Sequence, residues 1–448
     1  MKIAITTLGC KINQYDSAVI QSRLANEHSF VPFEEEADCY IINTCTVTDR
    51  ADWEARQLVR RAKRLSPKAK VLVTGCYAQV SPEDVAHLPG VDYVVGLNRL
   101  DDLLRFVETP TVNIGVKVAI SDVKRERGVP VLGTKVLPGH TRAFLKIQEG
   151  CNYSCTYCII PTARGLSRSV TPREVIEQVR QLADAGYLEI VLTGIHLGGY
   201  GQDLSPKTDL TALLEGIVKS RLIPRVRLSS LDPREVPDRL LDLIADADVI
   251  CPHLHICAQA GDDEILKRMR RNYDTAYYRD LLLKAREQLP DAALGSDIIV
   301  GFPRETDEQF ENSLDFFTSL PLTYFHVFPY SERRGTVAAS WPGHVPTPVK
   351  KMRAREMRAL GANKKREFCL RFQGRKSSVL VEDKVDNKTF CHRGFSRNYL
   401  PVVVRGADRL VNQEVDVELD GFENGWLTGS VWNIKASDRT PTRHIDER

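Results

Sequence analysis

The chain has 448 residues, 42% of them hydrophobic, and a formal net charge of +3. Its length predicts about two to four domains with packed cores, and the absence of any run of about 18 apolar residues argues against a membrane span. The amino-terminal stretch MKIAITTLGC has neither a long apolar region nor a small-residue cleavage site, so we expect a cytoplasmic protein without a secretory signal. Eleven cysteines in a reducing compartment favour metal binding or catalysis over a disulfide framework.

The first predicted domain, residues 1–110, alternates short strand patterns with helical patterns. Its strands are KIAITTL, CYIINT, KVLVTG and DYVVG, and residues with helical spacing follow the first three. This order is typical of a parallel sheet with helices on both faces.

Three cysteines of this domain each follow a different strand. Cys10, Cys45 and Cys76 come after the first, second and third strands, and the carboxyl ends of parallel strands meet at one edge of a sheet. We therefore expect these thiols to converge, although three unrelated loop cysteines are the alternative. Cys39 lies at the opposite end of its strand and should stay apart. Four other cysteines lack the spacing of ligands and are expected to be buried structural thiols: Cys251, Cys257, Cys369 and Cys391.

The second predicted domain, residues 138–370, contains six more strand patterns with helical patterns between them, which indicates a partial or complete β/α barrel. One helix, TPREVIEQVRQLADAG, should be opened by Thr171 and Pro172 and closed by Gly186. The stretch CNYSCTYC follows the first strand of this domain. It should therefore lie on the carboxyl face, where barrel enzymes carry their active sites.

The third predicted domain, residues 373–438, reads as a small antiparallel β-barrel of short strands. The Lys- and Arg-rich stretch 350–375 before it is either a solvated helix face or a surface that contacts phosphates. Within the barrel, GFSRNY carries Phe395, Arg397 and Tyr399, which can stack on bases or contact phosphates; a solvated loop is the alternative.

The triplet Cys151, Cys155 and Cys158 has too few thiolates for a closed metal site. Structural zinc sites use four Cys or His ligands, and a fully protein-bound 4Fe-4S cluster uses four thiolates. With three, one iron keeps an open position for a substrate or cofactor. The alternative is a zinc site completed from a distance by His196 or His255.

CNYSCTYC resembles the C-x3-C-x-aromatic-C motif of radical S-adenosylmethionine (SAM) enzymes. The resemblance implies that Cys151, Cys155 and Cys158 hold a 4Fe-4S cluster beside Tyr157. It also implies that SAM chelates the open iron and is cleaved to methionine and a 5′-deoxyadenosyl radical.

A wider resemblance covers nearly the whole chain. LGCKINQYDS, NTCTVT and GCYAQ are similar to the cysteine segments of the amino-terminal domain of radical SAM methylthiotransferases, and CIIPTARGLSRS, SDIIVGFPRET and KRMRRNY match further segments. The resemblance implies that Cys10, Cys45 and Cys76 hold a second 4Fe-4S cluster, whose free iron binds the sulfur to be transferred. The carboxyl-terminal barrel looks like a TRAM domain, an RNA-binding module.

The same resemblance suggests residues that contact SAM. TGIHLGGY occupies the place of the segment that binds the SAM amino group, which singles out Gly194. Ser230 ends the third barrel strand, where its hydroxyl can meet a ribose, and Gln259 is the retained residue of HLHICAQAG, in which Cys257 and Ala258 replace the usual residues. A turn glycine and a loop-capping serine are the alternatives.

The first motif indicates a branch of the family. GCKINQYDS is similar to enzymes that modify N6-threonylcarbamoyladenosine, whereas other branches usually have GCQMN or GCxKN. This implies methylthiolation of carbon 2 of that nucleoside at tRNA position 37, giving 2-methylthio-N6-threonylcarbamoyladenosine. The implied partners are tRNA, a sulfur donor and an electron donor such as flavodoxin or ferredoxin, without a membrane.

Three other functions remain open at this point. The substrate can be isopentenyladenosine in tRNA, or it can be a ribosomal protein. In a different class, the chain is a non-catalytic, metal-stabilised RNA-binding protein, which predicts four-ligand zinc sites and no cleavage of SAM.

Overall fold

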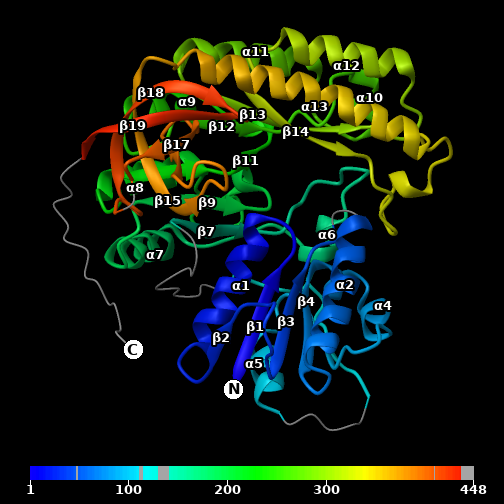
Figure 1. Cartoon of the computed structure of the whole chain (residues 1–448). Helices are drawn as coiled ribbons and strands as arrows, with labels where there is room; N and C mark the ends of the chain where they lie inside the picture. Colours follow the sequence, from blue (N-terminus) through cyan, green and yellow to red (C-terminus); the bar gives the residue numbers. More distant parts are fainter. Residues whose placement is uncertain (47–48, 110–114, 130–140, 408, 435–448) are drawn as a thin grey trace.

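The computed structural model describes residues 1–46, 49–109, 115–129, 141–407 and 409–434. Figure 1 shows an amino-terminal sheet in blue, a central region mostly in green and yellow, and carboxyl-terminal strands in orange and red. The predicted α/β multidomain fold is confirmed. The domain boundaries stay predictions, and residues 110, 138 and 435–438 lie outside the described residues.

The amino-terminal region is one fully parallel sheet of six strands in the order β2-β1-β3-β4-β5-β6. Its strands are β1 (Lys2–Thr7), β2 (Ser29–Val31), β3 (Cys39–Thr44), β4 (Lys70–Gly75), β5 (Tyr93–Val95) and β6 (Lys117–Ala119). Its helices are α1 (Lys11–Leu24), α2 (Asp49–Leu65), α3 (Cys76–Val80), α4 (Pro82–Ala86) and α5 (Leu100–Glu108). The short strands β2 and β6 were not predicted.

Helices cover both faces of this sheet, as predicted. Along β3, Tyr40 and Ile42 pack with residues of α2, whereas Cys39 and Ile41 pack in a second core with residues of α1 and α5. The alternation follows from the two-residue period of a strand. Cys39 is therefore a core residue, at the opposite end of β3 from Cys45.

The central region is a partial β/α barrel, as predicted. Its strands form two four-stranded sheets, in the orders β10-β9-β7-β8 and β11-β12-β13-β14. A single residue, Ser229, separates β10 from β11, and a parallel bridge between Val226 and Ile250 also links the sheets. The strands are β7 (Arg142–Glu149), β8 (Arg168–Ser169), β9 (Glu189–Gly194), β10 (Arg225–Leu228), β11 (Ser230–Leu231), β12 (His253–Ile256), β13 (Ala293–Val300) and β14 (Tyr324–Pro329).

The helices of this region are α6 (Ile160–Arg164), α7 (Pro172–Asp184), α8 (Leu210–Ser220), α9 (Asp238–Asp246), α10 (Asp263–Arg268), α11 (Thr275–Gln288), α12 (Asp307–Ser319) and α13 (Thr347–Leu370), with 3-10 turns at Leu197–Gly199, Pro233–Glu235 and Ala338–Ser340. Helix α7 has the predicted start, because Thr171 and Glu174 form a reciprocal capping box in front of Pro172. Within the described residues, no helix combines the length and apolar character that a bilayer span requires.

The carboxyl-terminal strands close into a barrel in the order β15-β16-β17-β19-β18. Four of its strand pairs are antiparallel, and β17 and β19 are parallel. An odd number of strands cannot alternate in direction around a closed ring, so at least one parallel pair is unavoidable. The strands are β15 (Lys376–Val385), β16 (His392–Ser396), β17 (Pro401–Arg405), β18 (Glu414–Glu423) and β19 (Trp426–Ile434).

This barrel contacts the central region through the GFSRNY segment. Arg397 donates a hydrogen bond to the carbonyl of Pro224 at 3.1 Å, and Tyr399 packs against His253 with ring centroids 4.5 Å apart. Phe395 stacks on Tyr399 at 4.9 Å. The segment is thus an interdomain contact, which corrects the interpretation as a solvated loop, whereas a role of these half-buried residues in contacting RNA stays a prediction.

Candidate functional site

The carboxyl end of β7 leads directly into the loop with the central cysteine triplet. Cys151, Cys155 and Cys158 line one cleft. Loops that follow β9, β11 and β12 form other walls of this cleft, so it lies at the carboxyl ends of parallel strands. This is the face on which the sequence predicted the site.

Three of the four residues expected to border the cluster or SAM also line this cleft: Tyr157, Ser230 and Gln259. Gly194 does not line it but ends β9 just before the lining residues, and a side chain there would come within 3.0 Å of Gln148 Oε1. Gln259 has a left-handed backbone with φ of 66°, which is uncommon for a residue with a side chain. The roles of these residues in SAM binding stay predictions.

Arg271 is a cleft residue that the sequence analysis missed. Its Nη1 lies 3.0 Å from Cys155 Sγ, and its Nε donates a hydrogen bond to the Tyr273 hydroxyl at 3.1 Å. Asp232, also in the cleft, forms an ion pair with the same guanidinium. The segment KRMRRNY pointed to this stretch, but only the fold brings Arg271 to the thiol.

His196, the first candidate for a fourth metal ligand, does lie beside the triplet. Its ring forms an ion pair with Glu235 and packs on Tyr153 at a centroid distance of 4.4 Å. Burial alone would lower the pKa of His196, but contacts with Cys151 and Glu235 raise it to about 9. The ring of His196 therefore already has hydrogen-bond partners in Cys151 and Glu235.

His255, the second candidate, does not line the cleft. Its Nε2 lies 3.0 Å from Asp297 Oδ1, and its Nδ1 lies 3.1 Å from the Tyr324 hydroxyl. Cys257 Sγ lies 3.4 Å from Asp297 Oδ2, so the donor atoms of His255, Cys257 and Asp297 are within 4.8 Å of one another. Both nitrogens of His255 thus have partners inside the barrel.

The three amino-terminal cysteines converge at the carboxyl edge of their sheet. Cys10 directly precedes α1, Cys45 follows β3, and Cys76 follows β4 as the first residue of α3. The Asn13 Oδ1 atom lies 3.6 Å from Cys10 Sγ and 4.0 Å from Cys76 Sγ. A side chain on Gly9 would come within 3.0 Å of Cys45 Sγ, so all three thiols border the same small volume.

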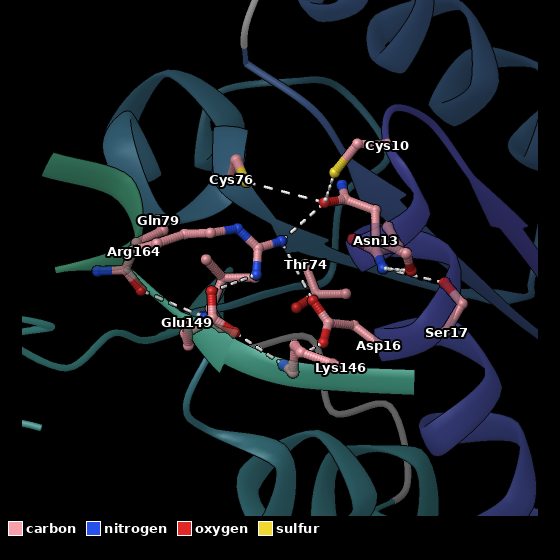
Figure 2. A network of polar contacts seen from close by, with 12 residues as sticks. Cys10, Asn13, Asp16, Ser17, Thr74, Cys76, Gln79, Lys146, Glu149 and Arg164 are labelled. Atoms are coloured by element: carbon pink, nitrogen blue, oxygen red, sulfur yellow. Dashed lines mark hydrogen bonds and ion pairs between the residues drawn. The ribbon is translucent and has the colours of Figure 1, made fainter. Parts of the chain in front are cut away.

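Two further residues at this second site were not predicted. Asn13 is fully buried, and its Nδ2 donates hydrogen bonds to the carbonyls of Leu8 at 3.0 Å and Thr44 at 2.9 Å, which joins the ends of β1 and β3. Arg164 of the central region donates from Nη2 to Asn13 Oδ1 at 2.7 Å (Figure 2). Interdomain contacts of this kind leave no periodic signal in the sequence.

The donor set at each site fits an iron–sulfur cluster with one open iron. All eleven cysteines are free thiols. Burial raises the pKa of Cys76 to about 12, although Arg164 opposes the rise, and burial raises that of Cys158 to about 12 as well. Metal binding at either site must therefore release protons, because the thiolate is the ligand. Cys391 is only half-buried, whereas Cys251, Cys257 and Cys369 are buried as predicted.

Comparison with protein families gives two matches. Residues 145–317 match the radical SAM superfamily, and residues 2–96 match the uncharacterized protein family UPF0004. The two matched ranges hold the central triplet and the three amino-terminal cysteines, respectively.

Curated relatives cover nearly the whole chain. The threonylcarbamoyladenosine tRNA methylthiotransferase MtaB of Bacillus subtilis is 39% identical over 93% of this chain and 93% of its own. The protein of the same name from Aquifex aeolicus is 38% identical over 91% of this chain and 97% of its own. The tRNA-2-methylthio-N(6)-dimethylallyladenosine synthase of Carboxydothermus hydrogenoformans is 35% identical over 93% and 96%.

Among solved structures, the radical S-adenosylmethionine methyltransferase TsrM from Kitasatospora setae superposes with a TM-score of 0.53. The match covers 75% of this chain and 77% of that one at 19% sequence identity. At that identity the likeness concerns the fold alone.

Proposed function

This chain belongs to the radical SAM methylthiotransferase family, and from that premise we propose that it transfers a methylthio group to carbon 2 of N6-threonylcarbamoyladenosine at tRNA position 37. The product is 2-methylthio-N6-threonylcarbamoyladenosine. The observation that carries the proposal is the presence of two separate three-thiol sites in one chain, one at each set of strand ends.

The choice of nucleoside rests on the relatives. Three relatives named for threonylcarbamoyladenosine are 38–39% identical to this chain and a fourth is 34% identical, compared with 35% for one named for dimethylallyladenosine. Lys11 adds support, because it makes no ion pair within the described part of the chain, and burial lowers its pKa only to about 8, so it is largely a cation at pH 7. A free ammonium suits the carboxylate of a threonylcarbamoyl group better than an apolar isopentenyl group.

The six thiols divide into two ligand sets in this proposal. Cys151, Cys155 and Cys158 hold the 4Fe-4S cluster that binds SAM. The second cluster is held by Cys10, Cys45 and Cys76. When bound, the two clusters supply the electron that cleaves SAM and the sulfur that is methylated and transferred.

Residues of the cleft then act on SAM and on the first cluster. Tyr157, Ser230 and Gln259 border the space for SAM, and Gly194 ends the strand that leads into it. Arg271 donates towards Cys155 Sγ and stays in place because Asp232 pairs with it.

The partners are tRNA, a sulfur donor and an electron donor such as flavodoxin or ferredoxin, and tRNA as substrate places the reaction in the cytoplasm. Part of the basic helix α13 is available to phosphates, because Lys351, Arg355, Arg358 and Arg366 are exposed. Arg353 of the same helix is instead buried in an ion pair with Glu305 at 3.1 Å. The barrel of β15–β19 adds a second candidate RNA surface.

Nucleoside analysis of tRNA from a deletion strain tests this function. We expect the 2-methylthio group to disappear from threonylcarbamoyladenosine only, and to return with the wild-type gene but not with Cys155→Ala. Loss from isopentenyladenosine would instead assign the chain to the other tRNA branch. Unchanged tRNA together with an altered ribosomal protein would move the substrate out of RNA.

A further inference from the structure

Arg164 links the two cysteine sites in space and along the chain. It is the last residue of α6, the short helix that begins two residues after Cys158, and its side chain is only 1% exposed. Figure 2 shows its guanidinium reaching from the central region towards Asn13 and Cys76 of the amino-terminal sheet. Arg164 therefore follows the central cysteine triplet in the chain but reaches the site of the three amino-terminal cysteines.

The guanidinium has partners on both sides of this boundary. Its Nη1 donates to Glu149 Oε1 at 2.7 Å, and its Nη2 reaches Asp16 Oδ2 at 3.1 Å in addition to Asn13. Glu149 is in β7, two residues before Cys151, whereas Asp16 and Asn13 are in α1, which follows Cys10. The buried Nε makes no hydrogen bond within the described residues, so this donor is available to a sulfur atom at the second site.

Lys146 is the fourth charged residue of this group, after Arg164, Glu149 and Asp16. Lys146 Nζ lies 2.7 Å from Asp16 Oδ1 and 2.8 Å from Glu149 Oε2, so two cations and two carboxylates form a closed set. Because their charges balance, the group can stay buried without an uncompensated ion. The set holds Arg164 rigidly, with its direction fixed by residues of both regions.

We propose that Arg164 is a positioning residue for the second cluster, which orients the sulfur ligands by hydrogen bonding and raises the electron affinity of that cluster. The inference rests on the proposed function, in that both sites hold clusters. Hydrogen bonds and positive charge at the sulfur atoms stabilise the reduced, more negative cluster. Arg164 and Glu149 belong to the chain segment of the first cluster, so this segment directly contacts the second site.

Redox titration of the reconstituted full-length protein, followed by electron paramagnetic resonance, tests this role. Arg164→Gln should make the second cluster about tenfold harder to reduce, a fall of about 59 mV for a one-electron couple, and leave the first cluster unchanged. Arg164→Lys keeps the charge and should give a smaller fall. A variant with Cys151, Cys155 and Cys158 replaced by Ala identifies the signal of the second cluster.

Arg225→Gln is the matched control. Arg225 is also fully buried and joins two regions, with ion pairs at 2.7 Å to both Glu189 and Glu414, but it contacts neither cysteine site. We expect it to leave both potentials unchanged.

The possible outcomes separate the inference from the proposed function. A selective fall in the second potential, or selective loss of the second cluster, in the Arg164 variants supports a positioning role. Equal changes in both clusters, an equal effect of Arg225→Gln, or unchanged potentials in fully loaded Arg164→Gln would overturn it. A wild-type protein that binds only about four irons would refute the two-cluster function itself.

Discussion

The central site takes its three cysteines from one short loop after β7, whereas the amino-terminal site takes Cys10, Cys45 and Cys76 from the ends of three elements. A single loop conformation brings the central thiols together. The amino-terminal thiols meet only when β1, β3 and β4 are paired in register. The second site therefore depends on the whole sheet, and on Arg164 from another region.

This difference predicts that the two sites respond unequally to substitutions. Substitutions that disturb the sheet or its contacts should empty the amino-terminal site and spare the central one. Direct loss of a ligand, in contrast, should remove only the site to which that ligand belongs.

Cys155→Ala should have the largest effect. We expect loss of SAM cleavage by at least 100-fold and a fall from about eight irons to about four, because the first cluster loses a ligand that Arg271 also contacts. Iron analysis and 5′-deoxyadenosine formation measure this after anaerobic reconstitution. Cys391→Ala, a half-buried cysteine of the carboxyl-terminal barrel, is the control and should keep full iron content. Colourless, zinc-loaded wild-type protein would refute both cluster assignments.

Cys45→Ala should separate the two sites functionally. Without the second cluster there is no bound sulfur to transfer, so methylthiolation should stop while SAM cleavage stays partly intact. The measurement compares 5′-deoxyadenosine with the methylthiolated nucleoside in the same reaction. Equal loss of both products would contradict two independent sites.

Gly9→Ala tests the assembled site without replacing a ligand. Gly9 has φ of 107°, and an added Cβ would lie 2.7 Å from Cys45 Cβ, so the two loops must move apart. We expect loss of about four irons from the amino-terminal site with SAM cleavage retained. Gly425→Ala is the control, because Gly425 also has a positive φ of 81° but open space around it. It should cost only about 1–2 kcal/mol of unfolding free energy, without iron loss; similar iron loss in both variants would show that strain alone empties the site.

Local signals account for what the sequence predicted well. The start of α7 depends on Thr171, Pro172 and Glu174, which are neighbours in the chain, and the place of the triplet depends on the strand just before it. The convergence of Cys10, Cys45 and Cys76 follows from the general rule that parallel strands end at one edge.

Two short strands, and contacts between residues far apart in the chain, could not be predicted from the sequence. The strands β2 and β6 have three residues each, none of them buried, so they lack the buried apolar run that revealed the equally short β5. Arg164 and Arg271 matter through partners that only the fold brings near them, and an arginine in a motif does not indicate its acceptor. The packing of Tyr399 on His253 is likewise a tertiary contact, so GFSRNY resembled a solvent-facing loop.

Cys257→Ala should have the smallest effect. It tests whether the fourth iron of the central cluster is free of a protein ligand. Cys257 is an additional thiol in the same cleft as the triplet, so it is the nearest chemical candidate for a fourth ligand. Cys257 Sγ donates a hydrogen bond to Asp297 Oδ2 at 3.4 Å, which the thiol would lose on becoming a metal-bound thiolate. We therefore expect unchanged iron content and an unchanged spectrum of the SAM-bound cluster. A changed spectrum would mean that Cys257 occupies the corner that SAM needs, and the central loop would then hold a closed cluster that cannot start the reaction.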